Sequence, residues 1–260
     1  MASLACELRC RKKVSRRKAG RSRAKIRGVS ATREEVAGNL ARVRERIERA
    51  AARAGRRSDE ITLIAVSKTQ PAEKIRELHG AGVRHFGENR VQEREAKSAE
   101  LADLEITWHM IGHLQKNKTA RAAALFRAID SVDSLTLADK LDAVSKERLR
   151  VLIEVKLDPE PAKSGVDATE LPRLLEAAMR LPNLDVLGLM GIPPYFDDPE
   201  ESRPYFRRLH ELRDSLTSGL AAARLPVLSM GMSHDFEIAI EEGATEIRVG
   251  TALFGERAKP

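Results

Sequence analysis

Eight short apolar segments alternate with helical patterns along the chain, and this alternation restricts the fold more than any other feature. The segments that read as strands lie at residues 61–67, 83–87, 107–112, 127–132, 150–156, 186–192, 227–232 and 246–250. Helical patterns follow from Pro71 and at residues 91–101, 117–126, 135–144, 169–179, 199–216 and 234–242, with only a trace of a helix after Gly255. Eight strand–helix repeats in 260 residues predict a single α/β domain, a (β/α)8 barrel of the TIM type.

An open doubly wound sheet is the alternative architecture. That fold expects fewer strands and usually a glycine-rich first turn, GxGxxG, whereas the first turn here is VSKTQP, residues 66–71. No repeat of solenoid period and no linker rich in proline or glycine divides residues 31–260. The sequence therefore favours the barrel.

An additional helix is expected before the first strand. Thr32 and Glu35 form a capping box in the sequence TREE, which is typical of a helix start, and Gly55 suits its end. Apolar side chains recur at helical spacing between them, at Val36, Leu40, Val43, Ile47 and Ala51. We expect this helix to cover the barrel with its apolar face.

The first 30 residues differ from the rest in charge. They hold eleven Lys and Arg residues against Glu7, a net charge of +10, so the remaining 230 residues carry −3 of the total of +7. Few large apolar residues and no period occur there, which predicts a disordered basic tail at residues 1–30 and a barrel domain at residues 31–260. Nucleic-acid binding by the tail is a disfavoured alternative, because no aromatic side chains accompany the charges. An organelle-targeting leader is a second alternative.

Cysteine usage and hydropathy exclude several classes of protein. The two cysteines, Cys6 and Cys10, lie in the tail and are interpreted as free thiols of a reducing compartment, because CxxxC without a third ligand is a weak metal signal. The body has neither a thiol nucleophile nor a disulfide. No segment approaches the ~18 apolar residues of a membrane span. We expect a cytoplasmic monomer that does not bind membranes, since no long apolar stripe is left exposed.

A single lysine stands at the end of the first predicted strand. The sequence LIAVSKTQP places Lys68 after an apolar run, with no acidic residue within seven positions before it or four after it. Burying an ammonium group is costly, so this position requires a chemical reason. In a (β/α)8 barrel the C-terminal ends of the strands form the functional face, so the polar residues that follow each strand should converge there.

The last two predicted strands are followed by small and hydroxyl-bearing residues. SMGMSHD supplies Gly231 and Ser233, and RVGTALFG supplies Gly250 and Thr251. Barrels often bind phosphate in the loops after strands seven and eight, where backbone amides and hydroxyls reach the anion. Either loop alone reads better as an ordinary turn and helix cap, but the two together favour a phosphate site.

A primary amine across the barrel mouth from a phosphate site suggests one cofactor. Lys68 can form a Schiff base with an aldehyde, and the phosphorylated aldehyde that proteins use in this way is pyridoxal 5′-phosphate (PLP). Arg248, just before the second phosphate loop, can point into the barrel and donate to the pyridine nitrogen of PLP. A structural ion pair with a barrel carboxylate is the other interpretation of Arg248.

Five motifs in order carry a resemblance to a known family. AVSKTQP, FGENRVQE, WHMIGHLQKNK, LMGI and SMGMSHDFEIAIEEGATEIRVGTALFG look like those of the pyridoxal phosphate homeostasis proteins, over residues 32–257. That family resembles the N-terminal barrel domain of alanine racemases. The phosphate contacts that the resemblance implies come from Ser233, Gly250 and Thr251, with Ser229 as the competing serine. The other contacts that it implies are the imine on Lys68, Arg248 at the pyridine nitrogen, Asn89 near the ring hydroxyl, and Met190 and Met230 as apolar neighbours.

The resemblance also implies a carrier rather than an enzyme. In the racemases the second catalytic base is a tyrosine from an added C-terminal domain, which is not expected here because the sequence ends at Pro260, soon after the eighth strand. Neither Tyr195 nor Tyr205 is convincingly placed as a second base. We therefore predict a protein of intracellular PLP homeostasis that buffers the cofactor and supplies PLP-dependent apo-enzymes. The alternative is a weak racemase, lyase or transaminase with Lys68 as its only base.

Two histidines, His109 and His113, are the remaining candidates for a metal site. They are four residues apart, but on a strand and its loop rather than on one helical face. HxxxH without a third ligand is a weak signal. We therefore expect no metal site, and we interpret both histidines as structural.

Overall fold

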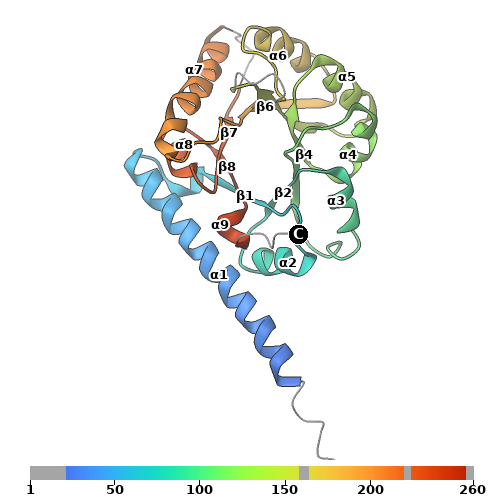
Figure 1. Cartoon of the computed structure of the whole chain (residues 1–260). Helices are drawn as coiled ribbons and strands as arrows, with labels where there is room; N and C mark the ends of the chain where they lie inside the picture. The colour runs from blue at the N-terminus through green and yellow to red at the C-terminus, as the bar shows by residue number, and fades with distance from the viewer. Residues whose placement is uncertain (1–21, 158–163, 220–223, 256–260) are drawn as a thin grey trace, which may run out of the picture.

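The computed structural model describes residues 22–157, 164–219 and 224–255, and its strands close into a parallel barrel surrounded by helices (Figure 1). The strands lie in chain order, and β8 pairs with β1 to close the sheet. They are β1 Thr62–Val66, β2 His85–Glu88, β3 Thr107–Met110, β4 Ala128–Val132, β5 Leu149–Val155, β6 Leu184–Gly191, β7 Val227–Met232 and β8 Glu246–Val249. The predicted (β/α)8 barrel is confirmed.

The helices also follow the predicted order. After the N-terminal α1 they are α2 Ala72–Gly80, α3 Val91–Ala96, α4 Thr119–Leu125, α5 Leu135–Val144, α6 Leu171–Met179, α7 Arg203–Gly219, α8 Phe236–Glu241 and α9 Thr251–Phe254, with 3-10 turns η1 Ser58–Glu60, η2 Lys116–Lys118 and η3 Pro199–Ser202. The last helix was expected after Gly255 but lies before it, because Gly255 at φ 82° ends the helix in the left-handed region. The first turn of α9 therefore begins directly after β8.

Helix α1, Ser22–Arg53, is the expected additional helix, but it begins ten residues before the predicted cap at Thr32. The capping box therefore lies inside the helix, although Gly28, Val29 and Ser30 just before it are not strong helix formers. The predicted boundary between residues 30 and 31 falls within α1, and residues 1–21, including Cys6 and Cys10, lie outside the described residues. The division into tail and domain stays a prediction.

The apolar face of α1 packs on the barrel as expected. Its buried side chains are Val36, Leu40, Val43, Ile47, Ala50 and Ala51. Figure 1 shows the helix running past α8 and α9, both of which it contacts. The helix is therefore fixed beside the last two strands, whose loops carry the predicted phosphate site.

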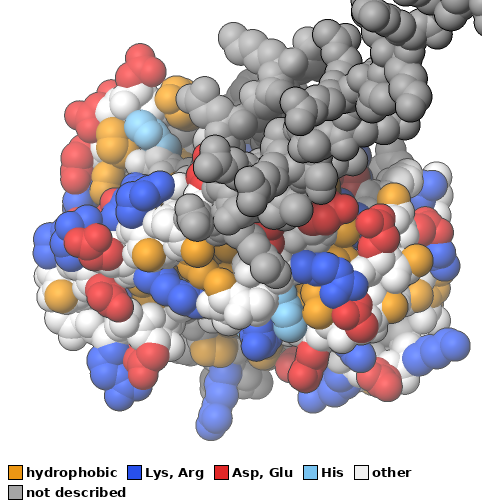
Figure 2. Space-filling model, turned by 90° about the horizontal axis from the view of Figure 1, so that it is seen from below, with side chains coloured by type: hydrophobic (Ala, Val, Ile, Leu, Met, Phe, Trp, Pro, Cys, Tyr) orange, Lys and Arg blue, Asp and Glu red, His pale blue; other side chains and the backbone are white. Residues whose placement is uncertain are grey.

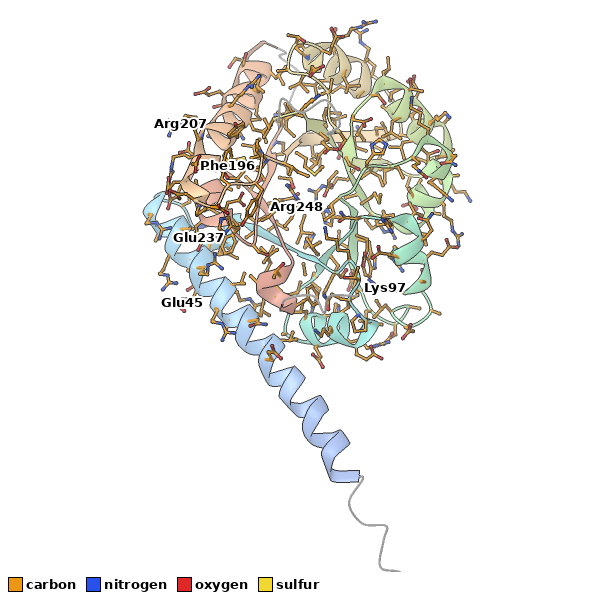
Figure 3. The ribbon with its side chains drawn as sticks, viewed as in Figure 1. Glu45, Lys97, Phe196, Arg207, Glu237 and Arg248 are labelled. Carbon is orange, nitrogen blue, oxygen red and sulfur yellow. The ribbon has the colours of Figure 1, made fainter. Side chains whose placement is uncertain are left out.

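Alternation along the strands gives the barrel a polar interior. In β8, Ile247 and Val249 face outward into the apolar core between the sheet and the helices. Glu246 and Arg248 alternate with them and point inward, and Figure 3 shows Arg248 within the ring of strands. Burial of charged residues inside a barrel requires mutual pairing, and this requirement shapes the functional site described below.

The surface seen in Figure 2 mixes both signs of charge. Basic and acidic side chains alternate over the described part of this side. Among the described residues, no helix combines the length and the apolar character needed to cross a bilayer.

Candidate functional site

A pocket of about 270 Å³ lies at the C-terminal ends of the strands and collects most of the predicted site residues. The predicted residues that line it are Lys68, Asn89, Ser233, Arg248, Gly250 and Thr251. They come from the ends of β1, β2, β7 and β8, which are far apart in the sequence but adjacent in the closed sheet. The expected convergence of strand-end polar groups is therefore observed.

Lys68 follows β1 in a tight turn. The amide of Gln70 donates to the carbonyl of Ser67 at 3.0 Å, which closes the turn around the lysine. Ser67 is fully buried, and Lys68 is half-buried and lines the pocket. This position suits a covalent bond to a ligand at the mouth.

Ser233 joins the two predicted phosphate loops. Its Oγ accepts hydrogen bonds from the backbone amides of Gly250 at 3.1 Å and Ala252 at 3.2 Å, and so it caps the first turn of α9. Gly231, two residues earlier, has φ 89°, and a Cβ there would lie 2.5 Å from that of Ala239. Only glycine therefore allows the β7 loop to fold tightly over α8. Amides and hydroxyls gathered in this way are typical of anion sites, so the phosphate site stays a prediction at this position.

Arg248 forms the floor of the pocket. It is 3% exposed; Nη1 donates to Ser229 Oγ at 2.8 Å and Nη2 donates to the carbonyl of Gly191 at 3.0 Å. Burial lowers the pKa of the guanidinium, and the opposing effect comes from the carboxylates of Asp130, Glu154, Asp235 and Glu246. An arginine remains charged under such conditions. The pocket thus has a cation whose position is set by two hydrogen bonds to neutral groups.

Three of the predicted contacts do not line this pocket; two of them lie on β7 and one on β6. Ser229, the competing phosphate serine, is fully buried, accepts from Arg248 and does not line the pocket. Met230 faces outward into the apolar core, and Met232 lines the pocket in its place. A register shift between Ser229 and Met232 pairs Met232 with Arg248, one residue later than a regular ladder would. Met190 is fully buried and does not line the pocket either.

Asn89, which lines the pocket, has a buried side-chain oxygen. Its Oδ1 is buried and has no hydrogen-bond partner among the described residues. A Cβ at Gly112 would lie 2.5 Å from the carbonyl oxygen of Asn89, so the β3 loop can approach Asn89 only with glycine there. Gly112 was not predicted as a site residue; the sequence MIGH contains it, but only the packing shows its use. A buried acceptor without a donor is a feature that a bound ligand can satisfy.

Sequence reasoning also missed part of the rim of the pocket. The remaining lining residues are Val66, Gln70, Ile111, Ile192, Tyr195, Met232, His234 and Gly255. Tyr195 is 74% exposed and stacks on His234, with ring centroids 5.5 Å apart. Tyr195 therefore stands at the mouth, whereas Tyr205 packs against Phe196 and the core; that neither acts as a second base stays a prediction.

A second group of charged side chains lies deeper in the barrel, below Arg248. His109, Asp130 and Glu246 are buried and bring ligand-type atoms within 4.8 Å of one another. The ring nitrogens of His109 contact Asp130 at 2.8 Å and His85 at 3.0 Å, and Glu246 pairs with Arg150. The three side chains form a buried charge network in which Asp130 Oδ1 and Glu246 Oε2 have no hydrogen-bond partner among the described residues, and the structural interpretation of His109 stays a prediction.

His113, the other predicted structural histidine, lies away from this network. It is mostly exposed and stands 3.2 Å from Asp133.

Comparison with known proteins places this fold and pocket in a class. The family described as alanine racemase, N-terminal domain, matches residues 38–258. The alanine racemase of Corynebacterium glutamicum superposes with a TM-score of 0.65 at 19% identity, over 86% of this chain and 61% of the racemase. This chain therefore belongs to the class of proteins that have the barrel fold of the alanine racemase N-terminal domain.

More similar relatives narrow the class. The pyridoxal phosphate homeostasis protein of Aquifex aeolicus is 51% identical over 221 residues, which are 84% of this chain and 96% of the relative. That of Escherichia coli K12 is 42% identical, over 86% of this chain and 97% of the relative. PipY of Synechococcus elongatus, solved with PLP bound, superposes with a TM-score of 0.76 at 41% identity, over 85% of this chain and all of PipY. The chain belongs to the pyridoxal phosphate homeostasis protein family.

Proposed function

We propose that this protein binds PLP as a Schiff base on Lys68 and works in PLP homeostasis, by buffering the reactive aldehyde and supplying it to apo-enzymes in the cytoplasm. One observation carries the proposal: an amine, a buried guanidinium and an anion cradle line the same pocket. The PLP-bound structure of PipY, a relative at 41% identity, supports the same ligand.

The pocket residues fit the functional groups of PLP. The cradle of Ser233, Gly250 and Thr251 would hold the phosphate. Arg248 would donate to the pyridine nitrogen, since its charge is maintained and its position is fixed. The buried Oδ1 of Asn89 would accept from the ring hydroxyl, and this oxygen would then have a hydrogen-bond partner.

Lys68 would supply the covalent attachment. The neutral amine adds to the aldehyde carbon, and one water leaves as the C=N bond forms, so the bond is reversible by hydrolysis. A reversible bond suits storage and delivery. An Arg partner at the pyridine nitrogen makes the ring a weaker electron sink than an acidic partner would, which favours holding the cofactor over carbanion chemistry.

A weak PLP-dependent racemase or lyase is the second candidate, and one observation favours it. Tyr195 lies on the rim of the pocket that Lys68 lines, so a second proton-carrying group is near the first. Overnight incubation with single enantiomers of alanine and serine, followed by chiral chromatography, separates the candidates. Robust turnover that is lost in Tyr195→Phe supports catalysis and overturns the carrier.

A spectrum and a chemical trap test the main proposal. The purified protein mixed with PLP should develop the visible band of an imine, and borohydride should fix the cofactor to a peptide that contains Lys68. Modification of another lysine, or of none, contradicts the assignment. Size-exclusion chromatography with light scattering on the same sample tests the expected monomer.

A further inference from the structure

The residue after Lys68 has an unusual backbone conformation. Thr69 has φ 63° and is the only non-glycine residue with positive φ among those that the structure describes. A β-branched residue in this region is a genuine outlier, because its side chain crowds the backbone. Such strain persists only where the surroundings impose it, and it is often found at functional sites. The strained residue lies directly beside the amine-bearing one.

Helix α3 contacts this turn on both sides of Lys68. A carboxylate oxygen of Glu93, Oε2, accepts from the backbone amide of Thr69 at 2.9 Å. The Nζ of Lys97 donates to the backbone carbonyl of Ser67 at 2.8 Å. Glu93 and Lys97 are four positions apart, which places them on one face of the helix. The two side chains thus hold the peptide groups that flank Lys68.

Glu88 anchors the second of these contacts. Its side chain is fully buried, and its Oε1 accepts from Lys97 Nζ at 2.6 Å and from Ser67 Oγ at 2.8 Å. Lys97 itself is only 12% exposed, and Figure 3 shows it beside α3, toward the barrel. A buried, charge-assisted pair of this kind is strong and geometrically defined. The side chain of Lys97 is therefore held in one position between Glu88 and the carbonyl of Ser67.

We propose that Glu93 and Lys97 are positioning residues, which clamp the strained Ser67–Thr69 turn so that the amine of Lys68 is aimed into the pocket. This inference rests on the proposed function of Lys68. Without the clamp the turn relaxes toward conformations that threonine prefers, and only a fraction of molecules presents the amine correctly. The apparent affinity for PLP then falls in proportion to that fraction.

Five variants test the clamp, each titrated with PLP and followed by the imine absorbance. Glu93→Ala removes the acceptor for Thr69 and should weaken imine formation about tenfold, the scale of one hydrogen bond to a charged group. Glu93→Gln keeps an oxygen acceptor and should stay near the wild type. Glu95→Ala is the matched control, because Glu95 is on the same helix but pairs with Arg121 at the surface.

Glycine at position 69 provides the decisive pair of variants. Glycine enters positive φ at no steric cost, so Thr69→Gly alone should bind PLP at least as well as the wild type. In the background of Glu93→Ala, the same change should recover most of the lost affinity. If Glu93 only stabilised the fold, Thr69→Gly would not restore the affinity for PLP in the Glu93→Ala background.

Hydrogen exchange of the Thr69 amide, measured without PLP, is the second readout. It should be faster in Glu93→Ala and unchanged in Glu95→Ala. If Glu93→Ala equals the wild type in both readouts while borohydride still labels Lys68, the clamp is wrong and the proposed function stands. If Lys68 is not labelled in the wild type, the proposed function fails, and the exchange rates alone decide whether α3 holds the turn. A tenfold loss in Thr69→Gly also overturns the clamp.

Discussion

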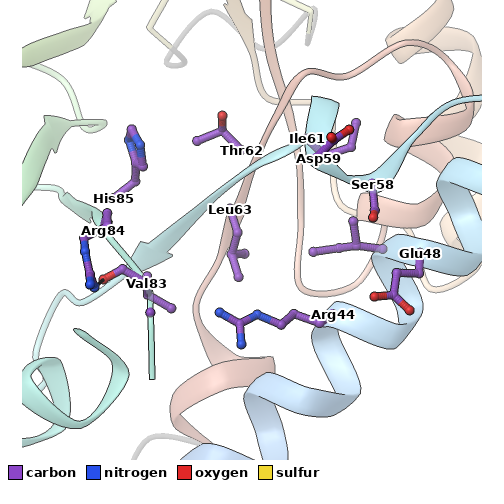
Figure 4. Close-up of a pocket in the computed structure, with 12 residues that line it drawn as sticks. Arg44, Glu48, Ser58, Asp59, Ile61, Thr62, Leu63, Val83, Arg84 and His85 are labelled. Atoms are coloured by element: carbon purple, nitrogen blue, oxygen red, sulfur yellow. Dashed lines mark hydrogen bonds between the residues drawn. The ribbon is translucent and has the colours of Figure 1, made fainter. Parts of the chain in front are cut away.

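The two ends of the barrel each carry a pocket, and the two pockets differ in volume and in the combination of groups that line them. The pocket at the N-terminal ends of β1 and β2, beneath α1, is the larger, at about 490 Å³ against about 270 Å³ for the pocket at the mouth (Figure 4). Its arginines are engaged with backbone: Arg44 donates to the carbonyl of Ala81 at 3.0 Å, and Arg84 donates to that of His79 at 2.7 Å. Volume alone is therefore a poor guide to function here.

The mouth is smaller but its groups are arranged for a ligand. It combines a lysine, a buried guanidinium, a capped helix start and a buried amide oxygen without a partner. The difference follows from the fold, because loops at the C-terminal face can vary around a fixed ring of strand ends, whereas the opposite face mainly stabilises the barrel. The comparison predicts that substitutions at the mouth affect ligand binding and that those at the base do not.

Lys68→Ala should have the largest effect, because it removes the only atom that the proposal gives for covalent attachment. The imine band should disappear entirely, and borohydride should no longer fix PLP to the protein. The urea midpoint should change little, since Lys68 is only half-buried. If this variant kept the same visible band, Lys68 would not be the attachment site, and the mouth would no longer be set apart from the base by its lysine.

Arg248→Met tests whether the floor of the mouth also carries stability. The change removes the donors to Ser229 Oγ and to the Gly191 carbonyl, and it removes a buried cation that the nearby carboxylates favour, so we expect a loss of about 1–3 kcal/mol in the free energy of unfolding. Arg84→Met at the base is the matched control; its guanidinium is exposed, and the loss should stay within about 0.5 kcal/mol. Urea unfolding of both variants gives the two numbers. Equal losses of unfolding free energy in the two variants would show that the burial of Arg248 does not cause the loss.

The sequence predicts the mouth well, because the barrel repeat and the strand-end polar residues are both local patterns. Lys68, Gly250 and Thr251 are recognisable as candidates from chemistry and position alone. It cannot distinguish Ser229 from Ser233, since that choice depends on the register shift in β7, which sets which residues reach the mouth. Bulges of this kind leave no reliable mark in the order of residues.

Contacts between distant segments account for the other differences. The turn at Thr69 reads as an ordinary strand end, and its positive φ follows from helix α3, more than twenty residues later. The approach of Gly112 to Asn89 depends in the same way on two loops meeting. The start of α1 at Ser22 also differs from the sequence-based boundary, since the capping box at Thr32 lies inside the helix.

Ser233→Ala and Thr251→Val should have intermediate effects. Each removes a hydroxyl from the proposed phosphate cradle while leaving the backbone amides, so the affinity for PLP should fall by ~1–3 kcal/mol per variant. Titration of absorbance measures both. Ser229→Ala is the informative comparison, because that hydroxyl contacts Arg248 and not the cradle. Competition by inorganic phosphate should weaken in the cradle variants and remain unchanged in Ser229→Ala.

His85 links the base of the barrel to its interior, and its titration should give the smallest effect. Burial, followed by the charges of His109 and Arg150, lowers the pKa of His85 to about 4 from 6.5, against an opposing contribution from Asp130. Between these two values the unfolded chain binds more protons than the folded protein, so stability should rise with pH from about 4 to 6.5 and fall on acidification. Because the ring is half-buried, solvent screening limits the effect to about 1 kcal/mol.

His85→Gln isolates this contribution, since glutamine can keep a hydrogen bond to His109 without titrating. The difference in unfolding free energy between wild type and variant should change by that amount between pH 4.5 and 6.5, in favour of the wild type at the higher pH. Taking the difference between two proteins cancels the carboxylates whose pKa burial raises, including Glu88, Glu154 and Glu246. PLP affinity at pH 7.5 should be the same in both, because His85 lines the basal pocket and not the mouth. A parallel loss of affinity would mean that the charge network couples the two ends, and the functional separation drawn between them would no longer hold.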